Sequence, residues 1–281
     1  MADLGSLAAA VPACLIDGQA ADRVAANDRG LAYGDGLFET LRVKHGRIAL
    51  IDLHLARLQR GIQRLRLDAD MPLIEAEWRD TAARLGQGVL KLLLTRSGGQ
   101  RGYAIAAEAR TTRILQSFPL REYPPEHAQK GIFLYPCQTR LARQPLLAGI
   151  KHLNRLEQVL ARSEWTDPQY AEGLVRDTEG LPIECTMGNL FLRTGAGWVT
   201  PDLAACGVRG VMRDYLVERL REAGEVVLES TPGYAELLGA TEVFCCNSLY
   251  GVWPVIGLED KRWQVGNHTR FAQTLVEQVM M

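Results

Sequence analysis

The sequence has no excess of charge of either sign, because its 281 residues include 32 lysines and arginines and 33 aspartates and glutamates. A protein that binds nucleic acid or an anionic membrane surface usually carries a basic patch or stripe. The balanced charge therefore argues against both kinds of partner, and a small molecule is the expected ligand. The length suffices for one large or two modest domains with a sizeable apolar core.

The sequence also lacks a long hydrophobic run, and no basic residue precedes its apolar N-terminal stretch, "MADLGSLAAAVPACLIDG". We therefore expect neither a signal peptide nor a membrane-spanning segment. Neither the cysteines nor the five histidines have the spacing of metal ligands, so we expect no metal site. Reduced cysteines in a cytoplasmic protein are the simplest interpretation. The six cysteines are Cys14, Cys137, Cys185, Cys206, Cys245 and Cys246.

Hydrophobic periodicity predicts an α+β fold with two domains. Strand-like stretches such as "VLKLLLTR" and "TTRILQSF" alternate with helix-like stretches such as "DLHLARLQRGIQRLRL" in the first part of the chain. Residues 118–131 concentrate proline and charge without either periodicity, which is typical of a linker. We expect a first α+β domain over 1–120, a linker over 121–130 and a second domain over 131–281. A cleft between two domains is a natural place for a cofactor.

Lys151 lies where a buried strand-like run meets an amphipathic helix, in "LAGIKHLNRLEQVL" (147–160). Apolar neighbours remove water from the ammonium group, lower its pKa and make the neutral amine available as a nucleophile or base. The alternative is a lysine that extends its charged end into solvent from the start of a helix. That alternative is the more common one for an isolated motif.

Two further stretches would suit a cofactor with a ring nitrogen and a phosphate. Glu184 lies on the return strand of a hairpin, in "PIECTMGNLF", where a buried carboxylate needs a cationic partner such as a protonated ring nitrogen. Gly207 and Gly210 precede a helix, in "CGVRGVMRDYL", whose free N–H groups would face a phosphate. A water-facing glutamate and a tight turn are the alternatives.

Three more side chains could contact a phosphate. Arg57 lies on the flank of the apolar face of "DLHLARLQRGI", from where it could reach across a cleft. Asn247 and Ser248 follow an apolar run in "CCNSLYG", at the end of an expected strand. Taken singly, a solvated arginine and a turn pair are the more common interpretations of these residues.

Taken in order, these residues resemble the fold-type IV pyridoxal-phosphate enzymes, the class IV aminotransferase family. The first domain adds "NDRGLAYGDGLFETLRV" (27–43) and "HLARL" (54–58), which are similar to further family segments. One departure from the family is Trp198, at a position where its members usually have an aliphatic residue. The family pattern E-x-[ST]-x-x-N-[apolar]-[FY] and its continuation are met by Glu184, Thr186, Asn189, Leu190, Phe191, Thr200, Val208, Gly210, Val211 and Arg213.

The resemblance implies a D-amino-acid-aminotransferase-like α+β fold with pyridoxal 5'-phosphate between the two domains. It implies a homodimer in which a loop of the partner helps to close the site. Lys151 would hold the cofactor covalently and serve as the base once released, and Glu184 would keep the ring nitrogen protonated. The phosphate would be held by Arg57, Val208, Arg209, Asn247 and Ser248.

Within the family, "LAGIKHLNRLEQVL" and "SGGQRGYA" look most like the lyases that convert 4-amino-4-deoxychorismate to 4-aminobenzoate and pyruvate. Phe38 and Tyr103 stand where D-amino-acid aminotransferases usually have a tyrosine and a histidine, and Arg101 is the candidate for a substrate carboxylate. An aminotransferase of D- or branched-chain amino acids is the alternative enzyme. A binding protein that does not use Lys151 is the alternative from another class. The sequence does not indicate a role for Asn154 or Arg155.

Overall fold

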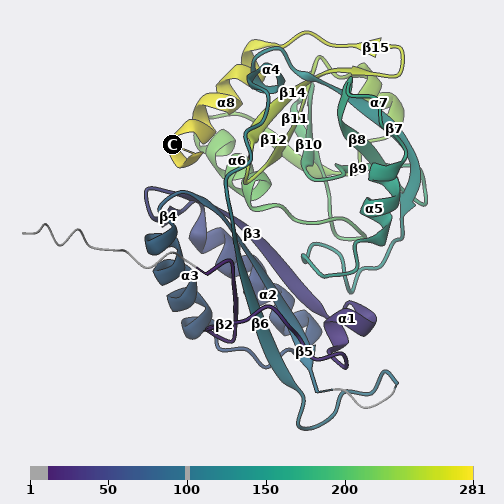
Figure 1. Cartoon of the computed structure of the whole chain (residues 1–281). Coiled ribbons are helices and arrows are strands. Elements are labelled where there is room, and N and C mark those ends of the chain that lie inside the picture. The colour runs from purple at the N-terminus through teal and green to yellow at the C-terminus, as the bar shows by residue number, and fades with distance from the viewer. Residues whose placement is uncertain (1–11, 99–101, 281) are drawn as a thin grey trace, which may run out of the picture.

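The computed structural model describes residues 12–98 and 102–280. Within these ranges the strands form a six-stranded sheet in the first part of the chain and a nine-stranded sheet in the second (Figure 1). Helices accompany both sheets, so the predicted α+β class is confirmed. No helix in the described ranges is long and apolar enough to cross a membrane.

The first sheet has the strand order β2-β1-β6-β5-β3-β4 and is antiparallel throughout. In β3, buried positions alternate with less buried ones, as expected for a strand with one face on a core. Helices α2 and α3 lie side by side on one face of this sheet (Figure 1). The elements are β1 (Cys14–Ile16), β2 (Gln19–Ala20), α1 (Arg29–Tyr33), β3 (Gly36–Lys44), β4 (Arg47–Ile48), α2 (Ile51–Leu65), α3 (Met71–Leu85), β5 (Gly88–Ser97) and β6 (Arg110–Phe118).

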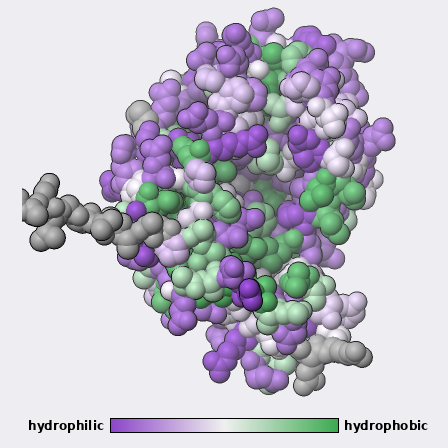
Figure 2. Space-filling model, in the orientation of Figure 1, coloured by the Kyte–Doolittle hydropathy of each residue, from purple (hydrophilic) through white to green (hydrophobic). Residues whose placement is uncertain are grey.

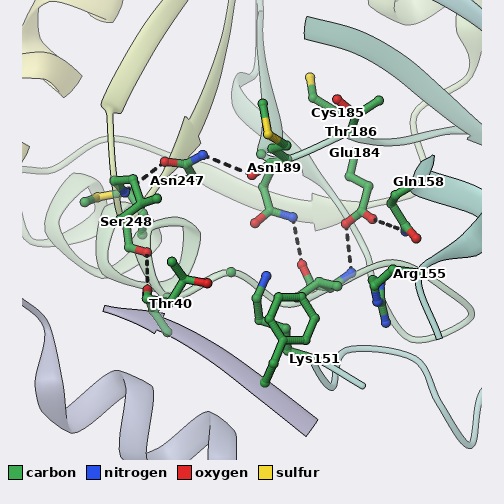
Figure 3. A pocket seen from close by; sticks show the side chains of 18 of the residues that line it. Thr40, Lys151, Arg155, Gln158, Glu184, Cys185, Thr186, Asn189, Asn247 and Ser248 are labelled. Atoms are coloured by element: carbon green, nitrogen blue, oxygen red, sulfur yellow. Dashed lines mark hydrogen bonds between the residues drawn. The ribbon is translucent and has the colours of Figure 1, made fainter. Parts of the chain in front are cut away.

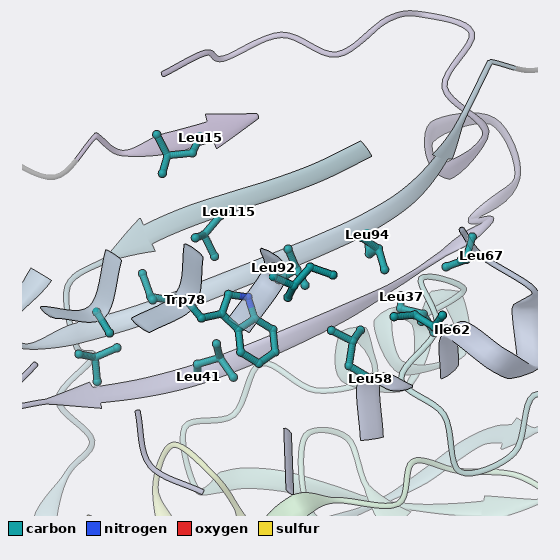
Figure 4. Packing of buried hydrophobic residues seen from close by; sticks show 14 of the residues in the cluster. Leu15, Leu37, Leu41, Leu58, Ile62, Leu67, Trp78, Leu92, Leu94 and Leu115 are labelled. Carbon is teal, nitrogen blue, oxygen red and sulfur yellow. The ribbon is translucent and has the colours of Figure 1, made fainter. Parts of the chain in front are cut away.

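The core of this half is built from the inward side chains of the sheet and of the two helices. Figure 4 shows Trp78 of α3 and Leu58 of α2 against the strand residues Leu41 and Leu92. All four are almost completely buried. Removing this apolar surface from water is the main favourable term that holds α2, and with it Arg57, against the sheet.

The second sheet has the order β12-β11-β10-β13-β14-β7-β8-β9, with β15 paired to β14. Strand β9 also pairs with β10 through Glu184 and Asn189, so the sheet curls back on itself. The elements are α4 (Pro125–Gln129), β7 (Ile132–Leu141), α5 (Leu156–Ser163), β8 (Tyr170–Asp177), β9 (Pro182–Cys185), β10 (Asn189–Thr194), β11 (Gly197–Pro201), α6 (Val211–Glu222), β12 (Val227–Ser230), α7 (Tyr234–Gly239), β13 (Glu242–Asn247), β14 (Gly251–Leu258), β15 (Lys261–Arg262) and α8 (Asn267–Met280).

Strand β10 is buried on both faces, which explains its uninterrupted apolar run. Leu190 and Leu192 belong to one hydrophobic cluster, whereas Phe191 belongs to another cluster that includes residues of α6 and α8. Because successive side chains of a strand point to opposite faces, both faces must be covered by apolar groups. This packing fixes the strand that carries Asn189 at its start.

The expected linker contains a short helix. Helix α4 begins at a proline, which is favourable at the first helical position because its missing N–H has no partner there. Its residue Ala128 and the preceding Tyr123 pack against the hydrophobic cluster of the second sheet. The ring of His127 also lies edge-on to Trp253, with ring centres 4.7 Å apart. The segment therefore lies against the second half and does not hang free.

The two halves are joined by backbone hydrogen bonds next to Lys151. The N–H of Phe38 donates to the carbonyl of Lys151 at 2.9 Å, and that of Leu153 donates to the carbonyl of Gly36 at 3.0 Å. The Lys151 segment thus pairs with the start of β3. These bonds place a lysine from the second half of the chain against a strand of the first.

Candidate active site

A cavity of about 570 Å³ lies between the two halves, and Figure 3 shows its lining. This volume is within the range of small-molecule sites in proteins. The first half contributes Phe38 and Thr40 from β3 and Arg57 from α2, Tyr123 comes from the expected linker, and the remaining lining residues come from the second half. Among the described residues, no group of three or more histidines, cysteines, aspartates or glutamates could hold a metal ion.

Lys151 lines this cavity, and its amine does not extend into bulk solvent. Its nitrogen lies over the ring of Phe38, 4.4 Å from the ring centre. Burial and the positive charge of Arg57 lower the pKa of the Lys151 amine to about 7, although Glu39 and Glu184 act in the opposite direction. At neutral pH a large fraction of this amine is uncharged, so it can act as a nucleophile or base.

Glu184 is a buried carboxylate held in one orientation. One oxygen, Oε2, accepts a hydrogen bond from the N–H of Val208 at 2.8 Å, and Oε1 accepts one from Nε2 of Gln158 at 3.4 Å. Burial raises the pKa of the Glu184 carboxyl, and the Val208 amide and Arg155 partly offset this effect. The side chain is 4% exposed, so it does not face bulk water. A cationic group in the cavity would stabilise its charged form.

Register places Asn189 next to Glu184. The two residues are paired across β9 and β10, and Nδ2 of Asn189 donates to the carbonyl of Val208 at 2.8 Å. The carbonyl of Val208 is therefore held by Asn189, whereas its N–H is held by Glu184. Figure 3 shows the bonds made by Asn189 and by Glu184 side by side in the cavity wall.

The expected phosphate contacts of Val208 and Arg209 need a correction. The N–H of Val208 already bonds Glu184, and the N–H of Arg209 donates to the carbonyl of Gly149 at 3.2 Å. The guanidinium of Arg209 contacts Asp214 at 2.9 Å. The backbone amides of the turn are thus in use, and they cannot also be the phosphate donors.

The start of α6, three residues further on, offers the free amides that the turn lacks. The helix begins at Val211 after Gly210, and no side chain caps its first turn. Gly210, Val211 and Met212 all line the cavity. Unpaired N–H groups and the positive end of the helix dipole favour an anion at this position. A Cβ at Gly210 would lie 2.0 Å from Oδ1 of Asn189, so no side chain fits there.

Arg57 is buried and paired, so its surroundings differ from those of a solvated arginine. Its Nε donates to Oε1 of Glu39 at 2.8 Å, and Nη2 donates to Oε2 at 2.5 Å. Nδ1 of His54 lies 2.6 Å from the same Oε2. Burial raises the pKa of Glu39, but Arg57 and His54 outweigh it and lower that pKa to about 2. The bidentate pair fixes the guanidinium at the cavity wall.

Ser248 and Asn247 both line the cavity, but they differ in what they offer to a ligand. Oδ1 of Asn247 accepts from the N–H groups of Leu249 and Tyr250, and its Nδ2 donates to the carbonyl of Met187 at 3.1 Å. Its side chain therefore builds the turn. The hydroxyl of Ser248 makes a single long bond of 3.4 Å to the carbonyl of Thr40, so it is the more available of the two.

The expected substrate residues are distributed differently. Phe38 lines the cavity beside Lys151. Tyr103 is 84% exposed, packs against Tyr33 with ring centres 5.4 Å apart, and does not line the cavity of its own chain. Arg101 lies outside the described residues.

The structure adds residues that the sequence analysis missed, above all Glu39. Leu37, Glu39 and Leu41 occupy the buried face of β3, and a glutamate at such an alternating inward position signals a buried partner. Gln158 and Arg155 also line the cavity near Glu184. Gln158 donates a hydrogen bond to Glu184, and Arg155 affects it electrostatically. Neither role could be recognised, because both relations join residues far apart in the sequence.

These groups fit pyridoxal phosphate by the chemistry of the donors. The cavity provides an amine with a pKa near neutrality, a buried carboxylate suited to a protonated ring nitrogen, and free amides at a helix start suited to a phosphate. Gly210 lets the start of the helix lie directly against Asn189, because a Cβ there would overlap the Asn189 side chain.

Comparisons with known proteins agree with this site. The family described as amino-transferase class IV matches residues 36–258. The chain is 33% identical over 244 residues to the aminodeoxychorismate lyase of Vibrio harveyi, covering 86% of this chain and 90% of that protein. Its structure is similar to the crystal structure of 4-amino-4-deoxychorismate lyase from Pseudomonas aeruginosa, with a TM-score of 0.93 and 48% sequence identity. The match covers 94% of this chain and 98% of that chain.

A more distant solved structure shares the fold alone. It is an aminotransferase from Brucella abortus bound to the cofactor PLP, with 21% identity, a TM-score of 0.76 and coverage of 94% of this chain and 97% of that chain. The match of the family model and the 33% identity together confirm the family predicted from the motifs. This chain belongs to the class IV aminotransferase family, whose members depend on pyridoxal phosphate.

Proposed function

We propose that this protein is a pyridoxal-phosphate-dependent lyase of folate biosynthesis, which converts 4-amino-4-deoxychorismate to 4-aminobenzoate and pyruvate. The observation that carries the proposal is the 48% identity to a structure named for this activity, over nearly the full length of both chains. The cavity supplies the residues that such chemistry needs. The reaction requires no second substrate, because the amine stays on the aromatic product.

Lys151 and Glu184 would carry the chemistry at the amine-bearing carbon. When bound, pyridoxal phosphate supplies an electron sink for the pair left behind by a departing proton. Lys151 would bind the cofactor and, once free, take that proton, a task that suits a pKa of about 7. Glu184, oriented by Val208 and Gln158, would hold the proton on the ring nitrogen.

The elimination balances without an added oxidant or reductant. One C–H bond at the amine-bearing carbon breaks, the C–O bond to the enolpyruvyl group breaks, and the ring becomes aromatic. The departing enolpyruvyl group gains one proton to become pyruvate, and Lys151 is placed to return it. Aromatic stabilisation favours this outcome over transfer of the amine.

The phosphate would lie against the start of α6. Its contacts would be the free N–H groups of Val211 and Met212, the hydroxyl of Ser248 and the guanidinium of Arg57. Asn247 would hold the turn that presents Ser248. Because Arg57 is already fixed by Glu39, it would bind without a further loss of side-chain freedom.

We further propose that two copies form a homodimer. Helix α5 exposes Leu156, Val159 and Leu160, which are 76%, 60% and 57% exposed. Figure 2 shows this hydrophobic patch on the surface over α5, beside the hollow of the cavity. Exposed apolar clusters of this kind mark interaction sites. Light scattering after size exclusion tests the proposal, because Leu160→Glu should yield monomers, whereas Leu73→Glu on α3 should not.

The domain limits and the location are also proposals. Limits of 1–120 and 131–281, joined by 121–130, are supported by the change of sheet between Phe118 and Ile132. A cytoplasmic location is supported by the free thiols of all six cysteines, since oxidising compartments favour disulfides. The cavity has lining residues from both halves, so the second domain alone should not release 4-aminobenzoate. Activity of such a fragment would contradict this arrangement.

Product analysis tests the activity directly. With 4-amino-4-deoxychorismate, the purified protein should release equal amounts of 4-aminobenzoate and pyruvate without a keto-acid acceptor. Lys151→Ala should abolish turnover and the visible absorbance of lysine-bound cofactor, while its circular dichroism is retained. Conversion of D-alanine or a branched-chain amino acid with 2-oxoglutarate, and no 4-aminobenzoate, would show an aminotransferase. Absence of any cofactor band after incubation with pyridoxal phosphate would favour a binding protein without this chemistry.

A further inference from the structure

Arg155 is a cation at the cavity wall that none of the roles above uses. A guanidinium has five N–H donors, and the Nε of Arg155 donates to the carbonyl of His152 at 2.9 Å. Its Nη2 is buried and has no hydrogen-bond partner among the described residues. No carboxylate forms a salt bridge with it in that part of the chain either. A buried donor without an acceptor is rare in native proteins and needs an explanation.

The other cations of the cavity are already engaged. Lys151 is reserved for the cofactor, and Arg57 makes its bidentate pair with Glu39. Arg162 donates to the carbonyl of Trp165 at 3.0 Å, and its guanidinium lies 4.5 Å from the centre of the Trp165 ring. Arg155 is therefore the arginine of the lining whose buried nitrogen lacks a partner.

The cofactor phosphate is not the missing acceptor, because its site lies elsewhere. In Figure 3, Arg155 lies beside Gln158 on one side of Lys151, and Ser248 lies on the other side. Of the carboxylates, Glu184 has the largest electrostatic effect on Arg155, but no hydrogen bond joins the two side chains in the described structure. An acceptor carried by a ligand, other than this phosphate, would satisfy the free nitrogen of Arg155.

We propose that Arg155 binds a carboxylate of the substrate and thereby selects for it. The inference rests on the proposed function, whose substrate carries one carboxylate on its ring and one on its enolpyruvyl group. The planar fork of an arginine suits bidentate recognition of a carboxylate. Arg155 lines the same cavity as Lys151, and Figure 3 shows it on the side of Lys151 away from Ser248.

A different role would be electrostatic, with Arg155 acting through Glu184. Its positive charge lowers the pKa of that carboxyl. If this were its whole role, removal of the charge would change kcat and the cofactor absorbance but leave the substrate KM unchanged. Loss of carboxylate binding would instead raise the substrate KM.

The test compares the holoenzyme with Arg155→Met, Arg155→Lys and the matched control Arg162→Met. We expect Arg155→Met to raise the KM for 4-amino-4-deoxychorismate about tenfold or more, with a smaller change in kcat. Arg155→Lys should recover part of the loss because it keeps the charge. Arg162→Met should stay within about twofold of the wild type.

Inhibition by the products gives a second measurement, and a purely structural role of Arg155 would not change it. Wild-type protein should be inhibited by 4-aminobenzoate or by pyruvate more strongly than by the corresponding methyl ester, and Arg155→Met should lose that preference for at least one of the two acids. An unchanged preference, an unchanged KM, or an equal loss in Arg162→Met would overturn the inference. Failure of the proposed function would appear in the wild type itself, as an absence of 4-aminobenzoate, and would overturn both.

Discussion

The low pKa of Lys151 predicts how the protein without cofactor takes up pyridoxal phosphate. Only the neutral amine attacks an aldehyde. At pH 7 about half of the Lys151 side chains are neutral, against roughly one in 3,000 for a lysine with the ordinary pKa of 10.5. The rate of covalent uptake should therefore be half-maximal near pH 7 and level off above it, whereas an ordinary lysine would gain rate up to about pH 10.

Glu184→Gln provides a perturbation with a defined sign. The negative charge of Glu184 favours the ammonium form of Lys151 and raises its pKa. Removing that charge should lower the pKa, so the midpoint of uptake should move to lower pH. Loss of the partner for the ring nitrogen would change the plateau as well, but it would not move the midpoint upward.

Stopped-flow absorbance of lysine-bound cofactor measures this uptake over a pH series. N-acetyl-lysine, followed over the same series, controls for ionisation of the cofactor itself, and Lys151→Ala controls for other lysines. A rate that still climbs tenfold per pH unit above about pH 9 would refute the low pKa. A midpoint in Glu184→Gln equal to or above that of the wild type would refute the electrostatic argument.

Three further predictions concern the groups around Lys151. Glu184→Gln should keep cofactor affinity but lose most turnover, whereas Arg57→Ala should weaken cofactor binding by about 1.5–3 kcal/mol, and equilibrium titration with kcat measurements would expose interchanged roles. Gly210→Ala should weaken cofactor binding because its Cβ meets Asn189, whereas Gly195→Ala, with open space around its Cβ, should not. Glu39→Gln breaks the buried pair with Arg57 and should lower the free energy of unfolding in urea by about 3–5 kcal/mol. Glu75→Gln breaks a surface pair with Arg79 and should cost about 0.5 kcal/mol or less, so equal losses would contradict the burial of the first pair.

The sequence predicts the parts of the site that are contiguous in the chain. Glu184 and Asn189 lie within one short motif, and the apolar run after Asn189 requires a strand buried on both faces. Lys151 stands out because a charge interrupts an apolar stretch. The start of α6 follows from a glycine before an amphipathic helix. In each case a local pattern carries the information.

The distribution of hydrogen bonds could not be predicted in this way. Whether the N–H of Val208 is free depends on where the Glu184 carboxylate lies, and this is set by the register of β9 against β10. Arg209 likewise donates to Gly149, sixty residues earlier. A motif indicates the loop but not which of its amides are free, so the sequence points to Val208 and Arg209, whose amides already have acceptors.

Glu39 shows that one partner of the site serves two purposes. It fixes the guanidinium of Arg57 at the cavity wall, where we propose that it contacts the phosphate, and its negative charge raises the pKa of Lys151 while Arg57 lowers it. Burial and Arg57 together outweigh Glu39, which keeps the pKa near 7. Substitution of Arg57 must therefore do more than weaken phosphate binding. It should also raise the pKa of Lys151 and move covalent uptake to higher pH, so that the affinity lost at pH 7 is partly recovered in alkaline solution.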